Sequence, residues 1–299
     1  MVGDSVRRLR YLFIFGFEQA LSCIFPVAIF GALALTKWLD FPIPRYDVLL
    51  IWCLFVQVVL VKTGLETMEE VKVISWFHVI GLGLELFKVQ MGSWSYPDEA
   101  LTKWFGVPLY AGFMYASVGS YVVQSWRRLD LEFLKMPPPL IAFGLGIAIY
   151  FNFFWHHVWL DLRWVLIGLV LLVFGRALVT YRLDDRRFTM PVVVAFFLIA
   201  CFIWFAENIV TFYNGWAYPN QLSGWALVDL GKLSSWFLLV IISILLVAWQ
   251  KRRGNSHEKR VPPSLAAHVF WLRRSLFGAG NHMDDKHIEW ERERERDNY

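Results

Sequence analysis

Two segments of the chain carry the same chemically competent residues in the same order. The turn Gly92–Glu99 (GSWSYPDE) follows Glu85, and the turn Asn214–Gln221 (NGWAYPNQ) follows Glu207 at the same spacing. Trp94, Tyr96 and Pro97 correspond to Trp216, Tyr218 and Pro219, and each residue lies 122 positions before its counterpart, as 85 lies before 207. A buried carboxyl group with aromatic hydroxyl and indole neighbours is suited to acid-base chemistry. Glu85 and Glu207 are therefore the candidate catalytic residues.

Further polar residues lie near both acids. Lys88 follows Glu85 by three positions, which places both on one face of a helix, and Asp229 and Lys232 share the same spacing. Asn208 directly follows Glu207. We expect these residues to form a pocket near the outer leaflet of the membrane, covered by the two turns. Its expected ligand-binding residues are Lys88, Trp94, Tyr96, Asn208, Trp216, Tyr218, Asp229 and Lys232.

Composition indicates which elements must position these residues. The 299 residues are 57% hydrophobic and 18% aromatic, and only 18% are charged, where soluble proteins carry roughly a quarter charged residues. The apolar residues form long continuous runs, which favour transmembrane helices over a membrane barrel with its short alternating strands. The sequence predicts an all-α polytopic bundle of about eight spans. The expected spans are residues 11–36, 47–61, 73–91, 107–126, 140–158, 164–181, 190–212 and 226–249.

Basic residues give the expected orientation. Cytoplasmic loops retain Lys and Arg. Basic clusters such as Arg7, Arg8 and Arg10 recur in every second segment between the predicted spans, which places them all on one side of the membrane. This places the N- and C-termini in the cytoplasm and both aromatic turns on the outer side. The net charge of +4 then reflects topology, so no nucleic-acid partner is expected.

The recurring turn also suggests how the chain is divided. If the third and fourth spans correspond to the seventh and eighth, residues 1–250 form a bundle of two parallel halves, 1–135 and 136–250, related by an axis along the membrane normal. Residues 251–299 are expected to form a cytoplasmic tail. Within it, the apolar and basic pattern of residues 264–278 predicts a short interfacial helix.

Structural interpretations of the same residues stay open. Trp and Tyr at a membrane boundary are commonly interfacial anchors, a buried Glu can join helices by hydrogen bonding, and Lys88 can extend to the headgroups. His156, His157 and Asn152 at the end of the fifth span could join the pocket. No phosphate loop, heme-attachment pattern or zinc helix is present, so no cofactor or metal site is predicted.

The segment from Glu85 to Leu131 resembles the YoaT-like family of bacterial multi-pass membrane proteins of unknown function. The resemblance implies a bacterial inner-membrane protein and carries no catalytic assignment. A weaker likeness, in Glu85, Gly92, Tyr96 and the run Gly106–Leu109, is to membrane carotenoid hydratases and lycopene cyclase domains. In those families an intramembrane acid is a plausible proton donor to a polyene, but Lys88 and the charged pair Asp98–Glu99 depart from their pattern.

Two functions are consistent with these patterns. In the first, the pocket binds or modifies a lipid-like or isoprenoid molecule of the bilayer by acid-base chemistry. In the second, the same acids serve a proton- or cation-coupled transporter of a small solute, and glycine or proline breaks in its helices would be expected near the membrane centre. A scaffold whose tail recruits a cytoplasmic partner is a third alternative. The sequence predicts no particular oligomeric state.

Overall fold

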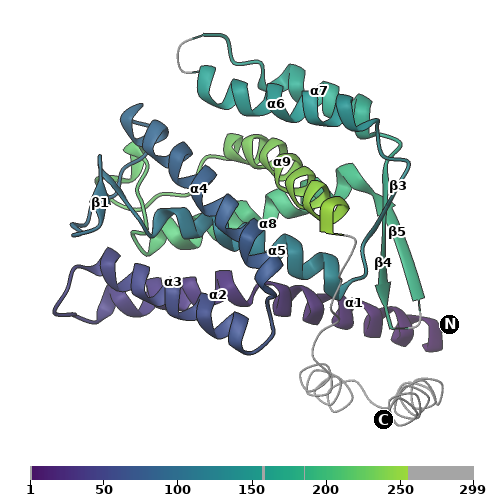
Figure 1. The fold of residues 1–299 in the computed structure, drawn as a ribbon, viewed down its shortest axis with the longest axis horizontal. Helices are drawn as coiled ribbons and strands as arrows, with labels where there is room; N and C mark the ends of the chain where they lie inside the picture. The colour runs from purple at the N-terminus through teal and green to yellow at the C-terminus, as the bar shows by residue number, and fades with distance from the viewer. Residues whose placement is uncertain (1, 157–158, 185, 255–299) are drawn as a thin grey trace.

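The computed structural model describes residues 2–156, 159–184 and 186–254 (Figure 1). The chain is mostly helical, as predicted. The helices are α1 Val2–Ser22, α2 Ile24–Trp38, α3 Arg45–Lys62, α4 Met68–Gln90, α5 Ala111–Arg128, α6 Pro139–Trp155, α7 Arg163–Phe174, α8 Val192–Phe212 and α9 Gly231–Gly254. The predicted interfacial helix at residues 264–278 lies outside the described residues.

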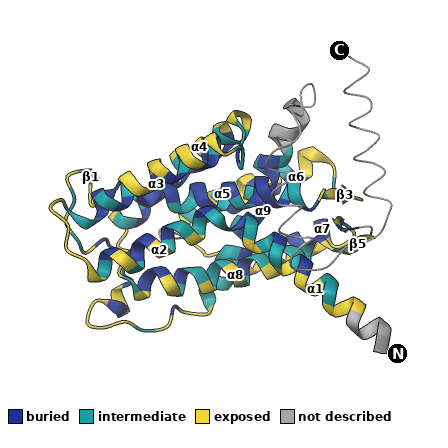
Figure 2. Cartoon of the chain, turned by 90° about the horizontal axis from the view of Figure 1, so that it is seen from below, coloured by how far each residue is buried: buried dark blue, intermediate teal, exposed yellow. Residues whose placement is uncertain are grey.

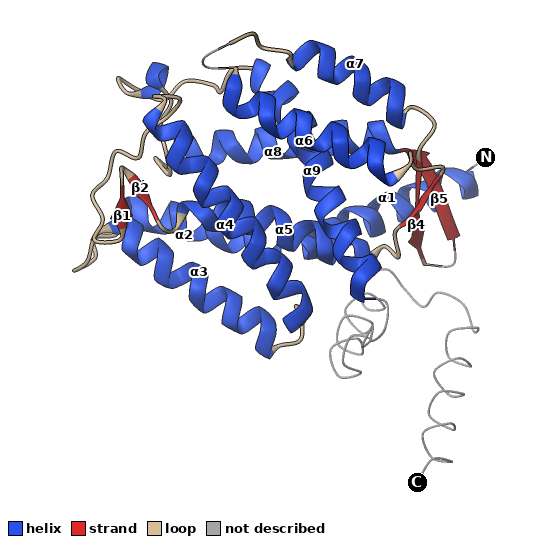
Figure 3. Cartoon of the chain, turned by 45° about the horizontal axis from the view of Figure 1, so that its top comes forward, coloured by secondary structure: helices blue, strands red, loops and turns tan. Residues whose placement is uncertain are grey.

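The structure also contains two small sheets, which the predicted all-α bundle does not include. A hairpin joins β1 (Lys103–Trp104) to β2 (Val107–Pro108), and β3 (Glu132–Leu134), β4 (Leu178–Leu183) and β5 (Arg186–Pro191) form an antiparallel sheet in that order. The predicted sixth span, residues 164–181, therefore ends as a helix at Phe174 and continues into β4. The segment LVTYRL is rich in β-branched and aromatic residues, which favour strands when a partner strand satisfies the backbone. The two sheets lie at opposite ends of the bundle (Figure 3).

The predicted first span is two helices and not one. α1 and α2 meet at a bend of 65° beside Cys23. Pro26 lies in the first turn of α2 and has no N–H to donate to the carbonyl of Ser22, and its ring disfavours a continuous helix at that point. Ser22 Oγ donates to the Glu18 carbonyl 2.9 Å away, a contact that often accompanies helix bending.

Several helices have the length and composition of membrane spans. Among the described residues, α8 and residues 231–248 of α9 are long and apolar enough to cross a membrane, with mean hydropathies of 2.3 and 2.1. The bent pair α1–α2 is a third candidate when taken as one span, whereas α6 and α7 are apolar but shorter. The count of eight spans stays a prediction.

The outer helices are arranged around a central group of helices, which holds the candidate site. α4 packs closely on α5 and α8 packs on α9, while α6 and α7 pair and cover α9 (Figure 1). α3 packs on α2 at the opposite side. Large apolar side chains are exposed on the outer helices, including Leu140, Trp164 and Leu172, and the buried residues lie between the helices (Figure 2). An outer surface of this kind suits contact with lipid.

Close contact between α4 and α5 depends on glycine. A Cβ built at Gly81 would lie 2.3 Å from the Tyr115 ring, and one at Gly112 would lie 2.6 Å from the His78 ring. Small residues permit such close approach of helices in membrane proteins. Gly83, two residues further along α4, is exposed and has open space where its Cβ would lie.

We predict opposite effects for alanine at these two glycines. Gly81→Ala forces the Tyr115 ring to move and is expected to lower the free energy of unfolding by about 1–3 kcal/mol. Gly83→Ala meets no neighbour and is expected to raise it by about 0.5–1 kcal/mol, because alanine restricts the unfolded chain. Thermal unfolding of both variants in detergent checks the prediction, and equal shifts in the same direction would contradict the packing argument.

Candidate functional site

The two aromatic turns are paired with each other. Ser95 N–H donates to the Ala217 carbonyl and Ala217 N–H donates to the Ser95 carbonyl, both at 2.9 Å. These residues are themselves 122 positions apart. Residues 95 and 217 thus form a small antiparallel bridge between segments that are distant in the chain.

The two helices that precede the turns end with the same backbone structure. Gly92 and Asn214 both adopt the left-handed conformation, with φ of 68° and 56°, which ends α4 and α8 in the same way. Glycine takes this conformation without steric cost, and asparagine is among the few other residues that do so readily. The chain therefore leaves each helix in a direction that brings the following turn back over the preceding glutamate.

Glu85 is enclosed by hydrogen-bond donors that carry no charge. Its Oε2 accepts from Trp94 Nε1 and from the Tyr96 hydroxyl, both at 2.7 Å, and its Oε1 accepts from the Tyr115 hydroxyl at 2.8 Å. The glutamate is only 5% exposed. Two donors come from the turn that follows α4, and the third comes from α5, so local and tertiary contacts both fix the carboxyl group.

Glu207 has a related environment. Its Oε1 accepts from the Tyr218 hydroxyl and its Oε2 accepts from Trp236 Nε1 at 2.8 Å. It is 3% exposed. The contact from Tyr218 is equivalent to that from Tyr96, since each tyrosine follows its glutamate by eleven residues.

The lysines near the acids rest on aromatic faces. Lys232 Nζ lies 4.4 Å from the centre of the Tyr218 ring and 5.6 Å from that of Trp94, so this residue of α9 contacts both turns. Lys88 Nζ lies 4.0 Å from the centre of the Phe153 ring on α6. Such cation–π contacts stabilise ammonium groups away from water.

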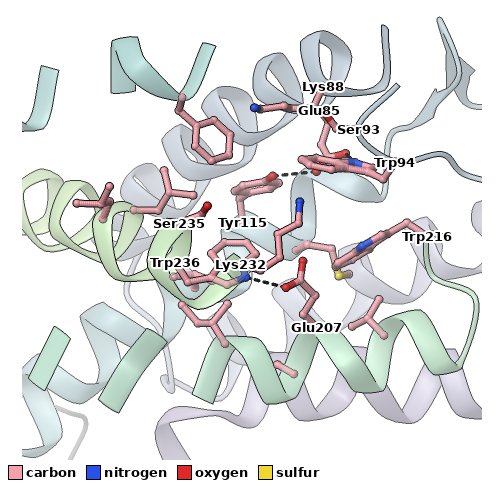
Figure 4. A pocket seen from close by; sticks show the side chains of 18 of the residues that line it. Glu85, Lys88, Ser93, Trp94, Tyr115, Glu207, Trp216, Lys232, Ser235 and Trp236 are labelled. Carbon is pink, nitrogen blue, oxygen red and sulfur yellow. Dashed lines mark hydrogen bonds between the residues drawn. The ribbon is translucent and has the colours of Figure 1, made fainter. Parts of the chain in front are cut away.

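Glu85 and Glu207 line the same cavity, which has a volume of about 490 Å³ (Figure 4). Six of the eight expected ligand-binding residues also line it, namely Lys88, Trp94, Trp216, Tyr218, Asp229 and Lys232. Asn152 and His156 line it as well. The structure thus brings together most of the residues that the sequence singled out.

Two expected binding residues lie outside the cavity wall. Tyr96 is 4% exposed and lies behind Glu85, to which it donates. The Asn208 amide accepts from Val228 N–H at 2.9 Å and donates to the Trp204 carbonyl at 2.8 Å. Asn208 therefore fixes the loop before α9. His78 of α4 also lies away from the cavity, and its ring packs on Phe113 of α5.

Sequence analysis missed two residues that contact the acids. Tyr115 and Trp236 line the cavity and donate to Glu85 and Glu207, respectively. They are not at equivalent positions, because the residue 122 positions after Tyr115 is Phe237. Their one signal in the sequence is an aromatic side chain with a polar hydrogen inside an apolar run, which needs a buried acceptor. Among the described residues, no three His, Cys, Asp or Glu side chains are grouped as a metal site would require.

Arg45 connects the supports of the site. Its guanidinium donates to the carbonyls of Leu33 on α2 and of Tyr213 and Asn214 after α8, and it pairs with Asp98 of the first turn at 2.9 Å. Five donors in a planar fork allow one side chain to serve several acceptors. The side chain is 15% exposed, so these contacts are partly shielded from water.

We predict that Arg45→Met loosens both turns. Removing hydrogen bonds from a charged donor to partly buried acceptors is expected to cost about 2–4 kcal/mol of unfolding free energy. Lys62→Met, at the exposed far end of α3, is the matched control and is expected to change it by no more than about 0.5 kcal/mol. Thermal unfolding in detergent measures both, and similar losses for the two variants would contradict the assigned role of Arg45.

Comparison with known proteins identifies relatives along most of the chain. A Bacillus subtilis (strain 168) protein, described as uncharacterized protein YoaT, is 55% identical over 248 residues, which cover 83% of this chain and 94% of YoaT. This confirms the resemblance inferred from Glu85–Leu131.

Two solved structures are also similar to part of the chain. One is a mycobacterial Insig homologue, MvINS from Mycobacterium vanbaalenii, with 15% identity and a TM-score of 0.44, and the other is a cross-linked MvINS trimer, with 17% identity and a TM-score of 0.42. Each covers 62% of this chain and 97% of the solved one. Residues 11–244 match the model of a family described as protein of unknown function (DUF817), and the chain belongs to that family.

Proposed function

We propose that this membrane protein binds a lipid-like or isoprenoid molecule and modifies it by acid-base chemistry. The observation that carries the proposal is that two buried carboxyl groups, Glu85 and Glu207, line one cavity between apolar helices. Carboxyl groups at membrane depth are costly, and they commonly mark functional sites.

The remainder of the cavity wall supports an amphiphilic ligand. Apolar side chains from α8 and α9, including Ile199, Phe202 and Leu238, line it together with the acids and lysines. A volume of about 490 Å³ is in the range of cavities that hold small organic ligands. A polar head near the carboxyl groups and a hydrocarbon portion against the apolar wall would each have a suitable environment.

The two acids share one neighbouring lysine unequally. Lys232 Nζ lies 4.4 Å from the ring centre of Tyr218, which donates to Glu207, and 5.6 Å from that of Trp94, which donates to Glu85. Enzymes that use two carboxyl groups commonly hold one as the proton donor and the other as the ionised partner. Lys232 is thus the residue that would distinguish the two acids.

The proposal includes the arrangement of the chain in the bacterial inner membrane. We place the aromatic turns at the outer face, both termini in the cytoplasm and about eight spans in two parallel halves. The matched helix ends at Gly92 and Asn214 and the pairing of Ser95 with Ala217 support the two halves. Each turn then closes one half of a pseudo-symmetric site.

Copurification tests the proposal. We predict that wild-type protein in detergent retains a specific hydrophobic molecule, detected by native mass spectrometry and lipid extraction, and that the double variant Glu85→Gln with Glu207→Gln loses it. Glutamine keeps the shape of the side chain and can turn its carbonyl oxygen toward the indole and its amide toward a tyrosine hydroxyl, but it has no acidic proton to donate and no charge to offer a ligand.

Glu66→Gln is the matched control. Glu66 is also a buried carboxyl group, 1% exposed, and it accepts from Ser120 and Gln57 outside the cavity. This variant is expected to retain the molecule. The proposal fails if folded wild-type protein and the double variant both carry only bulk phospholipid.

One observation favours a second function, the coupled transport of a small solute. The bend between α1 and α2 lies at the cavity, where Cys23 and Pro26 form part of the wall. Broken helices beside a binding cavity are characteristic of secondary transporters. Glu207 would then exchange a proton for a bound cation.

We predict for this second function that an imposed sodium or potassium gradient changes the internal pH of proteoliposomes. Glu207→Gln is expected to abolish the exchange because it removes the titrating group, and Glu66→Gln is expected to preserve it. A pH-sensitive dye inside the vesicles measures the rate. Rates equal to those of protein-free vesicles for both ions would exclude the exchange of a proton for sodium or potassium at Glu207.

A further inference from the structure

A second and smaller cavity lies next to the first. It has a volume of about 70 Å³ and is lined by apolar side chains of α4, α5 and α9, among them Phe77, Leu84, Val240 and Leu246. Ser243 also lines it, but its hydroxyl donates to the Leu239 carbonyl at 3.2 Å. Water gains few hydrogen bonds in an apolar space of this kind.

Tyr115 and Trp236 separate the two cavities. Both side chains line the large cavity and the small one, as do Val118, Ile203 and Leu239. Tyr115 and Trp236 are also two of the five aromatic donors to the acids, through the bonds from the Tyr115 hydroxyl to Glu85 and from Trp236 Nε1 to Glu207, drawn in Figure 4. The wall between the cavities is therefore fastened to the carboxyl groups.

We propose that the small cavity receives the end of the hydrocarbon chain of the bound molecule, and that Tyr115 and Trp236 form a gate which admits it. This inference rests on the proposed binding of a lipid-like molecule in the large cavity. It assigns the ligand class more closely, as an amphiphile with a polar head and one extended hydrocarbon chain, and it makes the small cavity the determinant of chain length.

The contacts of the gate link the two ends of the ligand. A head group that donates hydrogen bonds to Glu85 and Glu207 competes with Tyr115 and Trp236 for the same oxygens. Once released, either ring can rotate and join the cavities. Gly81 also lines the small cavity, and because it has no side chain the Tyr115 ring can lie directly against α4.

Binding of straight-chain alcohols of increasing length tests the inference, with affinity measured by displacement of a fluorescent fatty alcohol from wild-type protein in detergent. Ser243→Phe fills the small cavity from α9 and is expected to shift the preferred length to shorter chains. Each methylene group that no longer fits is expected to weaken binding about fourfold. Ser243→Leu is expected to give an intermediate shift and serves if the phenylalanine variant does not fold.

Cys201→Phe is the matched control, since Cys201 lies on α8 and lines neither cavity. Its length preference is expected to equal that of the wild type. If the alcohols bind but Ser243→Phe and Ser243→Leu retain the wild-type preference, the chain-length role is wrong and the large cavity remains a binding site. Absence of binding at every length overturns both this inference and the proposed function.

Discussion

A carboxyl group that is buried among apolar helices must receive hydrogen bonds from polar side chains, because the surrounding apolar side chains supply none. Glu85 and Glu207 impose this constraint twice, and five aromatic donors meet it. The donors must come from both the following turn and a neighbouring helix. The helix ends at Gly92 and Asn214, the return of each turn and the packing of α4 on α5 and α8 on α9 all serve this requirement.

The same constraint accounts for the connection between distant parts of the chain. Each turn lies over its own glutamate, and the two turns then lie close enough for Ser95 and Ala217 to exchange hydrogen bonds. Arg45 joins the first turn to the end of α8, and Lys232 of α9 rests on Trp94 and Tyr218 from different turns. Each acid has its own hydrogen-bond donors, but Arg45, Lys232 and the paired turns contact the surroundings of both acids. The two acids therefore line one cavity.

Aromatic residues in this site combine two roles. Tyr115 and Trp236 satisfy the acids with their polar hydrogens and present their apolar faces to the small cavity. A change in what the carboxyl groups bind is thereby coupled to the apolar space behind the rings. Glycine at position 81 is part of this arrangement, since a larger residue would displace the Tyr115 ring and with it a donor to Glu85.

The sequence by itself determined the membrane-like helical class, the family, the repeated turn and most of the charged residues of the cavity, because continuous apolar runs and a polar motif recurring at one spacing are local patterns. It did not reveal the bend at Cys23, the strand at residues 178–183 or the donors Tyr115 and Trp236. Only the tertiary structure decided these, since a strand needs a partner strand and a buried donor needs an acceptor on another helix. Which polar side chains meet depends on contacts between segments, and single-chain periodicity carries no record of them.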